Sequence, residues 1–143
     1  MQESKLEQAK AALQGDITFA AILKDDTLIT SEKKGIAPMM ALLSADEEVL
    51  AGAVVADRVI GRAAALLMQK AGVAQAYGSV VSTHALKVFQ AADLSFSYDR
   101  EVDYIINRAG NGMCPMEQTV LDLSDPEEAY AALRCRLAEL SAR

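Results

Sequence analysis

The fold of this chain is decided by residues 52–98, which read GAVVADRVIGRAAALLMQKAGVAQAYGSVVSTHALKVFQAADLSFSY. The segment alternates apolar runs with stretches of helical spacing, in the order run 52–57, helix 61–71, run 76–81, helix 84–92 and run 94–98. Strands that alternate with helices over short loops are joined by right-handed crossovers and lie parallel to one another. The segment therefore predicts an α/β fold with three parallel strands.

The helix predicted from Gly61 is the most apolar of the chain. Its polar residues are only Arg62, Gln69 and Lys70, and Gly72 closes it. Because so few polar side chains are available for a solvated face, we expect this helix to be largely buried. Its run of three alanines allows close packing on a sheet.

The residues before this segment predict a helix, a hairpin and a second helix. Helical spacing runs over 3–13, and alternation of apolar side chains predicts strands at 17–24 and 27–30 around a turn at Asp25-Asp26. Pro38 suits the first turn of a helix, because its missing N–H has no partner there. That helix is expected to end around residues 45–46.

The last third of the chain predicts loops and two further helices. Residues 99–101 are predicted to form a charged loop, and 102–107 fit either a strand or a helical turn. Residues 108–112 form a loop, and Pro115 opens a helix through Leu121. Ser124-Asp125-Pro126 combines a capping side chain with proline in the first turn, which predicts the start of the last helix. Without repeats or a linker, the 143 residues are predicted to form a single domain, 1–143.

The composition excludes several classes of function. The chain carries a net charge of −6, with its basic residues scattered, which is not the footprint of a nucleic-acid-binding protein. Its apolar stretches are far shorter than the ~20 residues of a membrane span. The first residues lack the apolar core of a secretion signal. We therefore expect a cytoplasmic protein with free thiols and without nucleic-acid partner, membrane segment or cofactor.

The residues that could ligate a metal are scarce. The chain has one His, His84, and two Cys, Cys114 and Cys135, none at the spacing of a zinc motif. Cys135 lies in the last predicted helix and is expected to be a packing residue. Cys114 directly precedes Pro115 at a predicted helix start, a position that lowers the pKa of a thiol. Two interpretations of Cys114 stay open, a small buried cap residue and a nucleophile.

Two glycines precede predicted helices that follow strands. Gly61, with Arg62 beside it, and Gly35, after Lys33-Lys34, would expose free backbone N–H groups to an anion. Two such helix starts can face one crevice at the carboxyl ends of the strands. The alternative is that both glycines only permit tight turns. Farther along, a second group of polar candidates surrounds a small apolar loop, where fixation of the loop and a binding role are both open: Asn107, Arg108 and Glu117.

Several motifs resemble the DUF1893 family, a family of unknown function, over nearly the whole chain. The most specific is Gly112-Met113-Cys114-Pro115-Met116-Glu117; others are Ile105-Ile106-Asn107-Arg108, Gly61-Arg62-Ala63-Ala64-Ala65-Leu66-Leu67, Val80-Val81-Ser82 with Ala85-Leu86, and Asp125-Pro126-Glu127-Glu128-Ala129-Tyr130. The resemblance implies a cytidine-deaminase-like fold, which is a three-layer α/β/α sandwich with a mixed sheet. The order of the predicted elements agrees with it.

The resemblance also sharpens the exclusion of zinc chemistry. Zinc deaminases place His-x-Glu at the helix after the hairpin and Pro-Cys-x-x-Cys at the helix after the third strand. Residues 35–38 (Gly-Ile-Ala-Pro) and 60–64 (Ile-Gly-Arg-Ala-Ala) occupy those places here, so neither holds a metal ligand or a general acid or base. The chain is therefore predicted not to be a zinc-dependent deaminase. The resemblance supplies no activity in its place.

Three functional hypotheses follow. The first is a non-catalytic ligand-binding or regulatory domain, which would bind a small anionic or nucleotide-like ligand through Gly35, Gly61 and Arg62, with Asn107, Arg108 and Glu117 as polar contacts. The second is a metal-independent enzyme that uses Cys114 as nucleophile. The third is an assembly role through methionines that offer an adaptable apolar surface: Met39, Met40, Met113 and Met116. The sequence is compatible with a homodimer and does not determine its symmetry.

Overall fold

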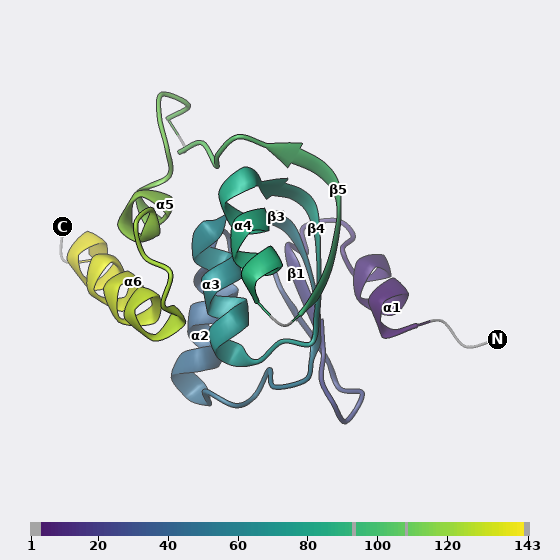
Figure 1. Cartoon of the computed structure of the whole chain (residues 1–143). Helices are drawn as coiled ribbons and strands as arrows, with labels where there is room; N and C mark the ends of the chain where they lie inside the picture. The colour runs from purple at the N-terminus through teal and green to yellow at the C-terminus, as the bar shows by residue number, and fades with distance from the viewer. Residues whose placement is uncertain (1–3, 93, 108, 142–143) are drawn as a thin grey trace.

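Within residues 4–92, 94–107 and 109–141, which the computed structural model describes, five strands form one mixed sheet (Figure 1). The strands are β1 (Phe19–Ile22), β2 (Leu28–Ser31), β3 (Val54–Ile60), β4 (Gln75–Ser82) and β5 (Ser95–Val102), and their order is β2-β1-β3-β4-β5. β3, β4 and β5 are parallel, as the alternation of strands and helices predicts, whereas β1 is antiparallel to both β2 and β3. The α/β class with a mixed sheet is thus confirmed.

Helices cover both faces of the sheet. The described residues form α1 (Lys5–Ala11), α2 (Ala37–Ala45), α3 (Arg62–Ala71), α4 (Thr83–Ala91), α5 (Pro115–Val120) and α6 (Pro126–Ser141). α1 lies alone on one face, α2, α3 and α4 lie on the other, and α5 and α6 pack outside α3 (Figure 1). The arrangement is that of a three-layer α/β/α sandwich, with an additional helical pair.

The central helix α3 is buried, as its composition predicts. Eight of its ten residues are buried, because the sheet, α4 and α6 all pack against it. Gly72 ends the helix in the left-handed conformation, at φ 76°, where a side chain would be strained. Since α3 is held on several sides, its first residues have well-defined positions at the end of β3.

Three sequence-based predictions need correction. Residues 99–101 are not a loop but part of the end of β5, because backbone pairing with β4 continues to Val102 although the side chains of 99–101 are exposed. Cys135 is exposed and does not pack, because α6 buries the stripe that contains Leu133 instead. Met39 is 1% exposed and belongs to the core, so it cannot contribute to a surface for assembly.

None of the helices in the described residues is both long and apolar enough to cross a membrane.

Candidate functional site

A pocket of about 340 Å³ lies at the carboxyl end of β3, and we call it the β3 pocket. It is lined by Thr18, Lys34, Gly35, Ile36, Asp57, Arg58, Val59, Gly61, Ala64, Ile105, Cys114, Met116 and Glu117. The start of β1, the loop before α2, the start of α3 and the segment through α5 all contribute to it. Gly35 and Gly61, which the sequence places at two separate helix starts, therefore share one cavity. Cys114 and Glu117, two other candidates, line the same cavity.

The Glu117 carboxylate occupies the amino-terminal end of α3. Its Oε1 accepts a hydrogen bond from the Arg62 backbone N–H at 2.6 Å, and its Oε2 accepts one from the Ala63 N–H at 2.8 Å. Glu117 is 4% exposed, and this burial raises the pKa of its carboxyl, while the two N–H groups act in the opposite direction. Glu117 thus caps α3, although its own position is the first turn of α5. The backbone N–H groups at the start of α3, which the sequence suggests as donors to an external anion, therefore already donate hydrogen bonds to a side chain of the protein itself.

Glycine at position 61 leaves room for the Glu117 carboxylate, which a side chain there would displace. A Cβ atom at this position would lie 2.4 Å from Oε1 and 2.5 Å from the carboxyl carbon of Glu117. The backbone of Gly61 itself, at φ −97°, is open to any residue. At Gly35 the backbone conformation, not the space, favours glycine. Its φ is 60°, which strains other residues, whereas nothing lies within 4 Å of a Cβ atom at that position.

The side chain of Arg62 is directed away from the β3 pocket. Its Nε donates to the Val120 carbonyl at 3.0 Å, and its Nη2 donates to the Leu123 carbonyl and to Ser124 Oγ. Its Nη1 donates to the His84 carbonyl at 3.4 Å. Arg62 therefore joins α3 to α4 and to the connection between α5 and α6.

Replacing Arg62 by lysine is expected to lower the free energy of unfolding by about 2 kcal/mol, because a single ammonium group cannot reproduce the fork of donors that satisfies these carbonyls. Urea denaturation of the variant measures the loss. Arg100→Lys on β5 is the matched control, since Arg100 is exposed and the change there should stay within about 0.5 kcal/mol. Equal stabilities of the two variants would contradict the role given to the guanidinium.

Asp57 is a site residue that the sequence reasoning missed. It is the sixth residue of the apolar run 52–57, it is 5% exposed, and it lines the β3 pocket. Burial raises the pKa of its carboxyl to about 7, although the backbone N–H groups of Val59 and Arg58 act in the opposite direction. The available signal was a carboxylate at the end of an apolar run, because an acidic residue is rarely buried unless it is paired or has a functional role.

Of the remaining candidates, Asn107 does not line the pocket, and Arg108 is not among the described residues. Asn107 bonds within its own loop, where its Nδ2 donates to Asn111 Oδ1 at 2.9 Å and its Oδ1 accepts from the Asn111 N–H at 3.2 Å. This pattern is that of loop fixation. Arg108 lies outside the described residues.

Cys114 is half-buried and precedes α5, and its thiol makes no capping hydrogen bond there.

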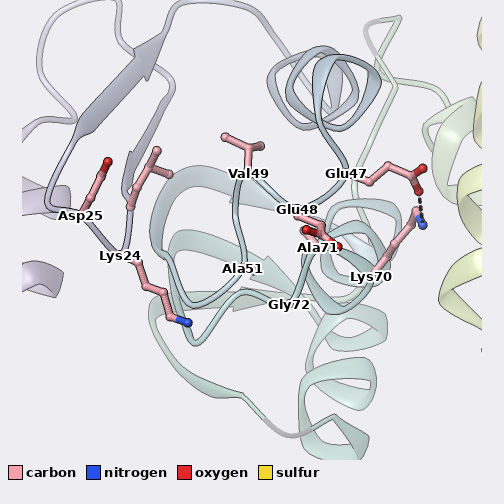
Figure 2. A pocket seen from close by; sticks show the side chains of 10 residues that line it. Lys24, Asp25, Glu47, Glu48, Val49, Ala51, Lys70, Ala71 and Gly72 are labelled. Carbon is pink, nitrogen blue, oxygen red and sulfur yellow. Dashed lines mark ion pairs between the residues drawn. The ribbon is translucent and has the colours of Figure 1, made fainter.

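Other sites in the described part of the chain are less suited to ligand binding. No three His, Cys, Asp or Glu side chains of those residues are arranged to hold a metal ion. A wider, more open hollow of about 550 Å³ lies beside Leu23 and Gly72, at the opposite end of the sheet (Figure 2). Its Lys70 ammonium is already bound by Glu47 and Glu127, at 2.8 Å each. Ligands of parallel α/β sheets bind at the carboxyl ends of the strands, which favours the β3 pocket.

Comparison with known proteins places this geometry in a family. The model of the family described as "Domain of unknown function (DUF1893)" matches residues 8–137. The crystal structure of a DUF1893 family protein from Thermotoga maritima matches with a TM-score of 0.79 and 29% sequence identity, over 97% of this chain and 92% of that one. No curated protein matches the chain.

Proposed function

The chain belongs to the DUF1893 family, whose description names no activity, and we propose from its own geometry that it is a non-catalytic small-ligand-binding or regulatory domain whose ligand binds in the β3 pocket. One observation carries the proposal. The pocket encloses about 340 Å³, and a few polar groups converge in it between largely apolar walls. This combination is typical of sites for small molecules.

The proposal includes an anionic or nucleotide-like ligand, whose charged group would meet the rim of the pocket. Lys34 is exposed and lines the pocket beside Gly35. The N–H groups at the start of α3 are held by Glu117, so Lys34 is the better candidate for contact with an anion. The cytidine-deaminase-like scaffold, the cytoplasmic location and a homodimer stay predictions.

Thermal unfolding in the presence of nucleotides and phosphorylated metabolites tests ligand binding. A ligand at a hundredfold excess over its Kd is expected to stabilise the protein by about 2.7 kcal/mol. The shift should shrink in Lys34→Ala and persist in Lys33→Ala, because Lys33 is the adjacent exposed lysine and does not line the pocket. A panel without any stabilising compound, or equal shifts in both variants, would count against binding at this rim.

The alternative function is a metal-independent enzyme with Cys114 as nucleophile, and it is favoured by the position of Cys114 in the wall of the pocket. If it holds, the rate of Cys114 alkylation should show a thiol pKa well below the ordinary ~8.5. The measurement requires a Cys135→Ser background, because Cys135 is exposed and would react as well. An ordinary pKa, or a thiol that does not react with the alkylating reagent, would leave the non-catalytic proposal in place.

A further inference from the structure

We infer that the β3 pocket receives a positively charged, N–H-donating group of its ligand, a protonated amine or an amidinium, which pairs with the Asp57 carboxylate at the pocket wall. The inference rests on the proposed function, since it names the chemistry of a ligand bound in the same pocket. It places the cationic part of the ligand in the interior and leaves any anionic part at the rim beside Lys34.

Asp57 is a buried carboxyl with no partner of opposite charge in the part of the chain that the structure describes. It lies on β3 between Phe19 of β1 and Gly78 of β4, and it is 5% exposed. Among the described residues, no Lys, Arg or His side chain forms an ion pair with it. A buried carboxylate whose charge is not compensated is costly, so native proteins seldom keep one. A cation supplied by a ligand would remove this cost.

The basic residues around the pocket do not compensate Asp57. The Arg58 guanidinium is already bound to backbone carbonyls, since its Nε donates to the Ile17 carbonyl at 2.7 Å and its Nη2 donates to the Gly15 carbonyl at 3.1 Å. The Arg62 guanidinium is bound to the carbonyls of Val120 and Leu123. Lys34 is exposed at the rim. Among the residues that the structure describes, the interior therefore presents a carboxyl that is available to a ligand and no free cation.

The second carboxyl of the pocket strengthens the preference for a cation. Both oxygens of Glu117 are engaged by the start of α3, but its negative charge remains in the pocket wall. An anionic group placed between the two carboxyls would be repelled by both, and the low dielectric of a buried site increases that repulsion. The same field attracts a cation.

The size and the walls of the pocket limit the rest of the ligand. A water molecule takes up about 30 Å³ in the liquid. The pocket of about 340 Å³ therefore has room for a ligand of on the order of ten non-hydrogen atoms. Ile36, Val59 and Met116 line it with apolar surface. A compact amine or amidine attached to a flat or aliphatic carbon frame fits these walls.

Binding of a cation is expected to release a proton near neutral pH. The raised pKa of Asp57, about 7, means that a large share of its carboxyls are protonated at neutral pH. Pairing with the ligand favours the ionised form, so the carboxyl proton leaves to the buffer while the ligand keeps its own. In the described part of the chain, the other titratable or charged groups that line this pocket or act on Glu117 are Lys34, Arg58, Arg62, His84, Cys114 and Glu117 itself. Because Glu117 can also titrate, the assignment to Asp57 needs a variant.

Three probes of equal size and shape separate the charge preferences: benzamidine as cation, benzamide as neutral amide and benzoate as anion. Each is titrated at millimolar concentration against the full chain, and binding is followed by the amide NMR signals of Gly61 and Cys114. Benzamidine is expected to bind most tightly. With a pKa of about 7 at Asp57, its affinity should fall about tenfold from pH 8 to pH 6.

Asp57→Asn is the decisive variant and Asp103→Asn, an exposed acid, is its matched control. Asp57→Asn should abolish both the preference for benzamidine and its dependence on pH, whereas the control should change neither. If Asp57→Asn does not fold, the pH dependence of the wild-type protein still decides, since a constant benzamidine affinity between pH 6 and pH 8 overturns the inference.

The failure of this inference differs from the failure of the proposed function. Benzoate or benzamide binding as tightly as benzamidine, or benzamidine binding undiminished in Asp57→Asn, would overturn the cation preference and leave a pocket that binds small molecules. If none of the three probes perturbs the pocket signals, the inference falls, and the nucleotide and metabolite panel then decides whether the proposed function falls with it.

Discussion

Replacing Glu117 by alanine is expected to lower the free energy of unfolding by about 4 kcal/mol. The substitution leaves the backbone N–H groups of Arg62 and Ala63 without their acceptor in a buried position. It also removes a negative charge from the positive end of the α3 dipole. Urea denaturation measures the loss, and Glu32→Ala, at an exposed loop position, should change stability by no more than about 0.5 kcal/mol.

A double-mutant cycle with Gly61 tests the geometric cause. In the wild-type chain, Gly61→Ala should cost about 2 kcal/mol, because the new Cβ displaces the carboxylate from its two donors. In the Glu117→Ala background the same substitution should cost much less, since the volume that the carboxylate filled is then free. Additive effects of the two substitutions would show that the close approach of Glu117 is not the reason for glycine at position 61.

Replacing Asp57 by asparagine is expected to stabilise the protein at pH 8 by up to about 4 kcal/mol. The pKa of Asp57 is raised to about 7 from 3.8, and a change of about three pKa units corresponds to a free energy of this size. Because the folded state holds a proton that the unfolded chain releases, the Asp57 contribution to stability falls as pH rises from about 4 to about 7 and is constant above. Asparagine is neutral throughout and avoids this loss.

The difference in unfolding free energy between Asp57→Asn and the wild type, measured by urea denaturation from pH 4 to pH 8, isolates this effect. Other carboxyls cancel in the difference, among them Asp25 and Glu47, whose pKa values are lowered. The difference should be small at pH 4 and grow toward pH 7. A difference that does not vary with pH would mean that Asp57 is not the titrating group.

The candidate site could be predicted in part. The two glycines were found because a helix that follows a strand in an α/β fold starts at the same end of the sheet as its neighbours, which places Gly35 and Gly61 on one pocket. Their partners could not be found in this way. Arg62 is adjacent to Gly61 in sequence but points to the carbonyls of Val120 and Leu123. The group that meets the start of α3 comes from Glu117, more than fifty residues later.

The sequence by itself determined the helices and helix ends that depend on neighbouring residues alone. The apolar composition of 61–71 predicted a buried helix, Gly72 its end, and Asp125-Pro126 the start of α6, because capping, proline and helical periodicity act over a few neighbouring residues. Only the tertiary structure decided that β5 extends to Val102, that Cys135 faces solvent, and that Glu117 caps α3. It also decided that Asp57 lies in the pocket wall without an ion-pair partner among the described residues. These features depend on contacts between segments distant in the chain, and the burial and charge that such contacts create are not encoded at any single position.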